Sequence, residues 1–167
     1  MLRQLAYRIA AAPALDRRPA SGITRVHRDT IVPATLDEAF AFFSAANNLE
    51  QLTPSWLNFR IRTPLPPVMR QGLLIEYEIR LYGLAIPWLT RIDVWEPGIR
   101  FVDRQVRGPY RWWHHEHRFE PAASGTRVID DVEFVPRVAW LTRGKVQRDV
   151  ERIFTFRQET LAALFAR

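Results

Sequence analysis

Two histidines, two aspartates and one arginine are the residues of this chain best suited to chemistry. The run His114-His115-Glu116-His117 lies in a segment whose apolar residues alternate as they do in a strand. Side chains alternate across a strand, so only His115 and His117 share a face. With Asp103 or Asp130 as a third ligand, they could form a two-histidine, one-carboxylate metal site. A histidine between two carboxylates can equally act as an acid and a base.

The pairing of neighbouring strands predicts that these groups meet inside the fold. Hairpin partners share a face, and the turn signals Pro97-Gly98 and Ser124-Gly125 help to set the register. The resulting register places Asp103 opposite His117, and His117 opposite Asp130. We therefore expect these three residues to form one row on the inner face of a sheet.

The C-terminal segment adds a positive charge to this row. Arg157 falls four residues after Ile153 and four before Leu161, on the apolar stripe of a predicted helix. A buried guanidinium needs a carboxylate partner. The sequence therefore predicts a buried polar cluster of Asp103, His117, Asp130 and Arg157, with His115 and Gln105 beside it.

Three roles for this cluster stay open at the level of sequence. It could be a satisfied polar network that sets sheet register and helix docking. It could anchor the polar head group of an apolar ligand, or His117, tuned by Asp103 and Asp130, could move a proton. We predict no metal and no cofactor, since the chain has no HExxH helix, no phosphate-binding glycine loop and no dinucleotide fingerprint.

The elements that must position these residues follow from hydrophobic periodicity. A strand is predicted from Ile23 to Val32, where Pro33 ends it. Thr35 and Glu38 form a capping box that begins a helix, and a second short helix follows at about 48–52. An apolar stripe marks a long helix at 142–166. Six further strands are predicted at about 58–63, 73–82, 86–96, 99–107, 112–121 and 126–136.

This order of elements predicts an α+β fold in which a curved antiparallel sheet of about seven strands wraps around the long C-terminal helix. The chain has ten Phe, six Trp and four Tyr, and such rigid apolar side chains are suited to lining a pocket. Those on the predicted inner faces are the expected ligand-binding residues. They are Tyr77, Trp88, Phe101, Trp113, Phe119, Phe134 and Phe154, together with His115.

The composition of the chain limits its location and the classes of partner that it can bind. With no Cys, the chain has no disulfide scaffold and no cysteine nucleophile, and we expect a cytoplasmic location. Half of the net charge of +6 lies in residues 1–22, which we interpret as a basic extension before a single ligand-binding domain at 23–167. We expect no nucleic-acid partner, because no basic stripe with interleaved aromatics is present. The extension is a candidate for peripheral membrane contact, and we expect a monomer or a weak homodimer.

Several motifs resemble the START-like (SRPBCC) superfamily, whose members have the helix-grip fold. The resemblance covers about residues 24–166, and within the superfamily the chain is similar to a bacterial cyclase/dehydrase-like or coenzyme Q-binding subgroup. It implies a deep cavity between the sheet and the C-terminal helix that takes lipids, quinones or polyketides. The residues on which the resemblance rests are Pro33-Ala34, Phe40 to Phe43, Leu52-Thr53-Pro54 with Trp56, Phe101-Val102-Asp103, Gly108-Pro109-Tyr110, Trp113-x-His115-x-His117-x-Phe119 and Gly125-Thr126 leading to Asp130.

The superfamily includes both carriers and cyclases, so the resemblance alone does not choose between them. We expect a non-catalytic protein that binds or carries one hydrophobic or amphipathic small molecule, such as a lipid, a quinone or a polyketide-like compound. The alternative is a polyketide cyclase, dehydratase or isomerase in which His117 acts with Asp103 and Asp130.

Overall fold

The computed structural model describes residues 17–64, 69–81, 83–137 and 139–166. The elements follow one another as one strand, one helix, two single-turn 3₁₀ helices, six strands and a long helix, which matches the predicted order except that the second short helix is replaced by the two 3₁₀ helices. In chain order they are β1 (Thr24–Val32), α1 (Leu36–Ser44), η1 (Ala46–Leu49), η2 (Ser55–Leu57), β2 (Arg60–Ile61), β3 (Leu74–Leu81), β4 (Leu84–Glu96), β5 (Arg100–Arg107), β6 (Tyr110–Ala122), β7 (Gly125–Pro136) and α2 (Ala139–Phe165).

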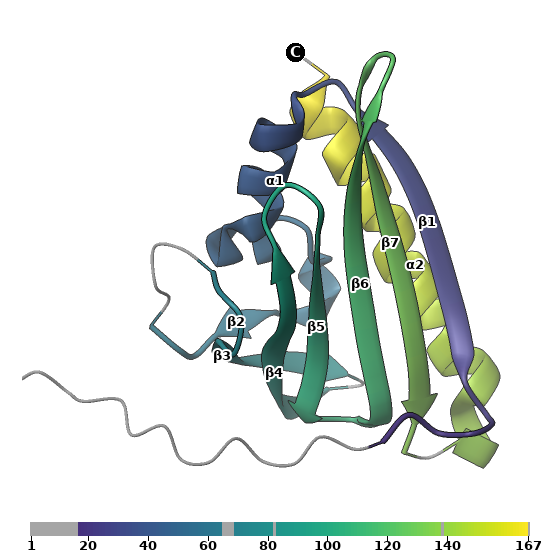
Figure 1. Cartoon of the computed structure of the whole chain (residues 1–167). Helices are drawn as coiled ribbons and strands as arrows, with labels where there is room; N and C mark the ends of the chain where they lie inside the picture. The colour runs from purple at the N-terminus through teal and green to yellow at the C-terminus, as the bar shows by residue number, and fades with distance from the viewer. Residues whose placement is uncertain (1–16, 65–68, 82, 138, 167) are drawn as a thin grey trace, which may run out of the picture.

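The seven strands form one antiparallel sheet in the order β1-β7-β6-β5-β4-β3-β2. Consecutive strands from β2 to β7 are neighbours, and β1 returns to pair with β7 at the far edge. Figure 1 shows α2 running behind β7 and β1, along one face of this sheet, and α1 covering another part of the same face. The predicted fold class, a curved sheet wrapped around a long C-terminal helix, is confirmed.

Local sequence explains how the chain enters and leaves α1. The Glu38 backbone amide donates to Thr35 Oγ1 at 3.3 Å, and the Thr35 amide donates to Glu38 Oε2 at 2.9 Å, which completes the predicted capping box. The short helix predicted at 48–52 is instead two separate 3₁₀ turns, η1 and η2. Pro54 separates them, because a proline disfavours helical geometry in the residue before it.

The β5–β6 hairpin departs from the predicted register by two residues. Asp103 pairs with His115 instead of His117. The cause is Gln105, whose side-chain amide donates to the Tyr110 carbonyl at 2.7 Å and whose Oε1 accepts from the Tyr110 amide at 3.2 Å. Gln105 thus closes the hairpin loop, and it belongs to that turn instead of the polar cluster where we expected it. A shift of two keeps every side chain on its predicted face.

The other predicted pairings around the cluster are confirmed. Ile92 lies opposite Asp103, because a bulge between Ile92 and Val94 restores the register after the β4–β5 turn. His117 lies opposite Asp130 on β7. Asp103, His115, His117 and Asp130 therefore all face the helix side of the sheet.

The opposite face of the sheet is covered by arginine ion pairs. The Arg104 guanidinium lies 4.3 Å from the ring centre of the buried Trp112 and 3.4 Å from Asp93. Arg18, within the predicted N-terminal extension, donates two hydrogen bonds to Glu133 at 2.8 and 2.9 Å. Residues 1–16 of that extension lie outside the described residues, so its predicted membrane contact stays a prediction. No helix among the described residues is long and apolar enough to cross a bilayer.

Candidate functional site

A cavity of about 280 Å³ lies between the inner face of the sheet, the turns that follow α1, and α2. Its walls are mainly aliphatic and aromatic, which is typical of sites for small apolar molecules. Six of the predicted ligand-binding residues line it: Tyr77, Trp88, Phe101, Trp113, His115 and Phe154. They come from β3, β4, β5, β6 and α2, so the cavity exists only where these elements meet.

Phe119 and Phe134 face the same side of the sheet but do not line the cavity. The Phe119 ring packs against Phe40 and Phe43 of α1, with ring centres 5.2 and 5.3 Å apart. Phe134 is fully buried, and its ring centre lies 5.6 Å from that of Tyr110. Alternation correctly predicted their face, but other side chains cover them and make them part of the solid core.

Several cavity residues that the sequence did not predict come from outside the predicted strands. Phe43 of α1 and Leu49 of η1 form part of the wall, and Leu52 and Tyr110 add to it from loop and strand end. The stripe of Ala39, Phe40 and Phe43 on the capped helix is the signal that could have identified α1 as part of the wall.

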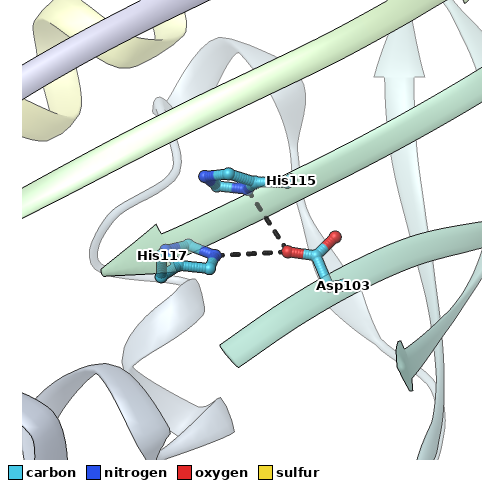
Figure 2. A group of neighbouring side chains, drawn as sticks. All are labelled: Asp103, His115 and His117. Carbon is cyan, nitrogen blue, oxygen red and sulfur yellow. Dashed lines mark hydrogen bonds and ion pairs between the residues drawn. The ribbon is translucent and has the colours of Figure 1, made fainter. Parts of the chain in front are cut away.

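The polar end of the cavity is a closed arrangement of two imidazoles between two carboxylates. Asp103 Oδ2 lies 3.2 Å from His115 Nδ1 and 3.2 Å from His117 Nε2, as the dashed lines in Figure 2 show. On the other side, Asp130 Oδ1 lies 3.0 Å from His115 Nε2 and 2.8 Å from His117 Nδ1. Each carboxylate therefore bridges both histidines, and all four ring nitrogens face a carboxylate.

Arg157 completes the predicted cluster from α2. Its Nε lies 3.5 Å from Asp130 Oδ2, and its Nη2 lies 3.4 Å from His117 Nδ1. The guanidinium carbon also lies 5.1 Å from the ring centre of Phe43, within the range of a cation–π contact. The contact with Asp130 is an ion pair and not an aligned hydrogen bond, since Arg157 Nε has no hydrogen-bond partner.

Burial and mutual attraction shift the pKa values of the carboxylates strongly. Burial would raise the pKa of Asp103, but the charge on His115 and the hydrogen bonds from both imidazoles hold it far below its usual value. Burial would likewise raise the pKa of Asp130, but the Arg157 charge and the same two imidazoles lower it well below the ordinary range. Both aspartates are therefore ionised.

The two histidines are shifted in opposite directions. Burial lowers the pKa of His115, but the Asp103 charge and hydrogen bonds to both aspartates outweigh it and raise the pKa overall. Burial and the positive charge on His115 both lower the pKa of His117. One protonated imidazole together with Arg157 then balances two carboxylates, which suits a buried site.

Asp103, His115, His117 and Arg157 line the cavity, whereas Asp130 lies behind the imidazoles. Asp103 is the most accessible of the four acid and imidazole side chains, with 17% of its surface exposed against 6% or less for the others. Its carboxylate can accept a hydrogen bond from a molecule in the cavity. Asp103, His115 and His117 also offer three donor atoms within 4.8 Å of one another, which is a spacing that a metal ion could bridge.

Solved structures with the same fold support the architecture. Zhui aromatase/cyclase from Streptomyces sp. R1128 is 17% identical with a TM-score of 0.69, over 87% of this chain and 94% of that chain. Protein CV1439 from Chromobacterium violaceum is 18% identical with a TM-score of 0.66, over 87% and 98%. Ginseng major latex-like protein 151 from Panax ginseng is 9% identical with a TM-score of 0.63, over 87% and 99%.

These similarities confirm the helix-grip fold that the sequence predicted. At such low identity they establish the fold alone. No curated protein sequence matches the chain. A family model does match residues 71–165, which span β3 to α2 and include every member of the polar cluster. Because this match covers more than half of the chain, the protein belongs to the family described as Domain of unknown function (DUF8410).

Proposed function

We propose that the protein binds one amphipathic small molecule in the cavity between the sheet and α2, with its apolar part among the aromatic side chains. The observation that carries this proposal is the cavity of about 280 Å³, apolar over most of its wall and with a few polar groups. Binding sites for small molecules combine these two features, because apolar surface supplies affinity and a few polar groups set orientation. Lipids, quinones and polyketide-like compounds all have this chemistry.

The polar end of the molecule is expected at the wall formed by Asp103, His115 and His117. Asp103 accepts hydrogen bonds there, so a hydroxyl or phenol group would suit it. A second polar point lies at Tyr77 and Thr90, whose hydroxyl groups are 3.1 Å apart and border the same cavity. A ligand with two separated oxygen substituents would fit both points.

Binding is favoured over acid–base catalysis by the way the imidazoles are held. Each ring nitrogen of His115 and His117 already faces a carboxylate within 3.2 Å. A general acid or base needs a nitrogen within hydrogen-bond reach of the substrate. Neither imidazole offers one without breaking a contact, so the cyclase alternative has less support than carriage.

The test is to identify what the cavity holds. Protein purified from its own host would be analysed by native mass spectrometry, followed by organic extraction of any bound molecule. We expect one stoichiometric amphipathic compound. The matched variants are Val146→Trp, which places an indole in the cavity from α2, and Arg148→Trp, at an exposed position two residues on.

The Val146→Trp variant should lose the compound, and Arg148→Trp should keep it. A fluorescent probe provides a second measurement, because Trp88 and Trp113 line the cavity and would transfer energy to bound anilinonaphthalene sulfonate. Transfer should fall in Val146→Trp only. An empty wild-type protein that also shows no energy transfer to the probe would contradict the proposal.

A further inference from the structure

The sequence motifs predict no metal, but the geometry of three side chains points to one. We propose that Asp103, His115 and His117 form a binding site for one divalent transition-metal ion, with Zn²⁺ as the ion that suits the donor set best. The donors would be Asp103 Oδ2, His115 Nδ1 and His117 Nε2. Two imidazoles and one carboxylate are a donor set found in zinc and non-haem iron sites. This inference does not depend on the proposed small molecule, because the site is built from the chain alone.

The distances from Asp103 Oδ2 to the two imidazole nitrogens suit a bound ion, and all three donor atoms lie within 4.8 Å of one another. Asp103 Oδ2 lies 3.2 Å from each of the two imidazole nitrogens. Donors bound tetrahedrally at zinc distances of about 2.0–2.1 Å are separated from one another by about 3.3 Å. Figure 2 shows the three side chains converging from the adjacent strands β5 and β6. The spacing of His115 and His117, two residues apart on one strand, places both rings on the same face.

The far side of each imidazole has the partner that metal-binding histidines require. His115 Nε2 and His117 Nδ1 lie 3.0 and 2.8 Å from Asp130 Oδ1. In metal sites a ligating histidine usually donates its second N–H to a carboxylate, which orients the ring and directs its lone pair at the ion. Asp130 is 4% exposed and is paired in turn with Arg157. It is therefore the positioning residue for both ligands.

The count of hydrogen-bond donors also favours an ion. Four ring nitrogens face carboxylate oxygens within 3.2 Å, but two neutral imidazoles supply two N–H groups. One protonated and one neutral imidazole supply three, so without an ion one contact still lacks a proton, and a further proton would place two positive charges on rings whose centres are 3.7 Å apart. An ion at Asp103 removes the conflict, because both N–H groups then point to Asp130 and both lone pairs point to the metal.

The site would keep one coordination position open to the cavity. All three proposed ligands line the cavity wall, and Asp103 is partly accessible from it. Three protein ligands with an open position are typical of zinc sites that bind water or a substrate oxygen. The open position would receive a hydroxyl, carbonyl or carboxylate oxygen.

The experiment measures metal in the full chain, purified without a polyhistidine tag and stripped with EDTA. The protein would be dialysed to equilibrium against micromolar ZnCl₂, and bound zinc measured by inductively coupled plasma mass spectrometry. We expect about one equivalent per chain. CoCl₂ in place of zinc should produce visible absorption bands, because Co²⁺ reports tetrahedral nitrogen and oxygen donors.

Matched variants separate this site from adventitious binding. His115→Gln and Asp103→Asn should each lose stoichiometric zinc. The controls His114→Gln and Asp131→Asn change neighbouring residues on the outward-facing positions of the same and the adjacent strand, and should keep it. Asp130→Asn should weaken zinc binding about 10- to 100-fold and alter the Co²⁺ spectrum, as expected for a positioning residue.

Two results would overturn the proposal. One is a folded wild-type protein, verified by near-ultraviolet circular dichroism, that retains less than a tenth of an equivalent of zinc. The other is zinc retention by a folded His115→Gln or Asp103→Asn variant equal to that of His114→Gln. Neither outcome bears on whether the cavity binds a small molecule, so the two proposals fail separately.

Discussion

Reversing the charge of Arg157 should destabilise the fold strongly. Arg157 is 8% exposed, and its Nε lies 3.5 Å from Asp130. Removing one partner of a buried ion pair costs about 3–5 kcal/mol, because the other charge is left buried without compensation. A glutamate at this position would in addition set a new carboxylate against Asp130. The cost is a large part of a total stability of about 5–15 kcal/mol.

The predicted effect can be expressed as a melting temperature. For a domain of this size, each kcal/mol lowers the midpoint by roughly 2–4 °C. Arg157→Glu should therefore melt at least about 6 °C below wild type, and up to about 20 °C below it, if it folds at all. Arg157→Met, which keeps the length of the side chain and removes the charge, should fall between the two.

The assay is thermal unfolding followed by circular dichroism, in EDTA so that metal content does not contribute. Arg148→Glu is the matched control, because Arg148 lies on the same helix and is exposed. Its midpoint should stay within about 2 °C of wild type, as is usual for surface substitutions. If Arg157→Glu and Arg148→Glu melt together, Arg157 does not compensate the buried aspartates and the cluster has been misinterpreted.

Three further predictions concern single positions. Gly125 has φ +138° and any Cβ would collide with the Val32 carbonyl, whereas Gly98 has φ +73° with open space around it. Gly125→Ala should therefore lower the free energy of unfolding, measured in urea, by at least about 2 kcal/mol more than Gly98→Ala. Equal losses in the two variants would contradict this prediction. Gly144→Ala in α2 meets no atom and should raise stability by about 1 kcal/mol, so a lower midpoint would refute it. Hydrogen bonds from Arg18, with Arg25 beside it, hold the pKa of Glu133 at about 2. This pKa is below that of the unfolded chain, so the ion pair stabilises the fold above roughly pH 5, and the stabilisation is lost as the pH falls toward 2. The difference in melting midpoint between wild type and Glu133→Gln should shrink over that pH range. A constant difference would argue against the ion pair.

Much of the fold could be predicted from the sequence because its signals are local. The capping box of Thr35 and Glu38 begins α1 as expected, and the alternation in β3 correctly places Tyr77 on the inner face. Arg157 was predicted to join the cluster from its position on the helical stripe alone. These inferences need only the period of a helix or a strand, and that period does not depend on distant parts of the chain.

Apart from Gln105, the members of the polar cluster were predictable from the sequence, but their geometry was not. The sequence placed Asp103 opposite His117, whereas the structure pairs it with His115. The error arose at Gln105, whose side chain closes the hairpin in a way that no turn signal announces. Because the shift is two residues, the parity of the strands survived, and the same side chains reached the same face.

The sequence by itself determined that the four acid and imidazole side chains of the polar cluster face inward, because that choice follows from alternation along β5, β6 and β7. Only the tertiary structure decided which inward residues border a cavity and which are sealed in the core. Phe119 and Phe101 share the inner face, yet the rings of α1 cover Phe119 while Phe101 lines the cavity. The tertiary structure also set both carboxylates against both imidazoles. These outcomes depend on how far each residue lies along its strand relative to α1 and α2, and that distance is set by packing between elements distant in sequence.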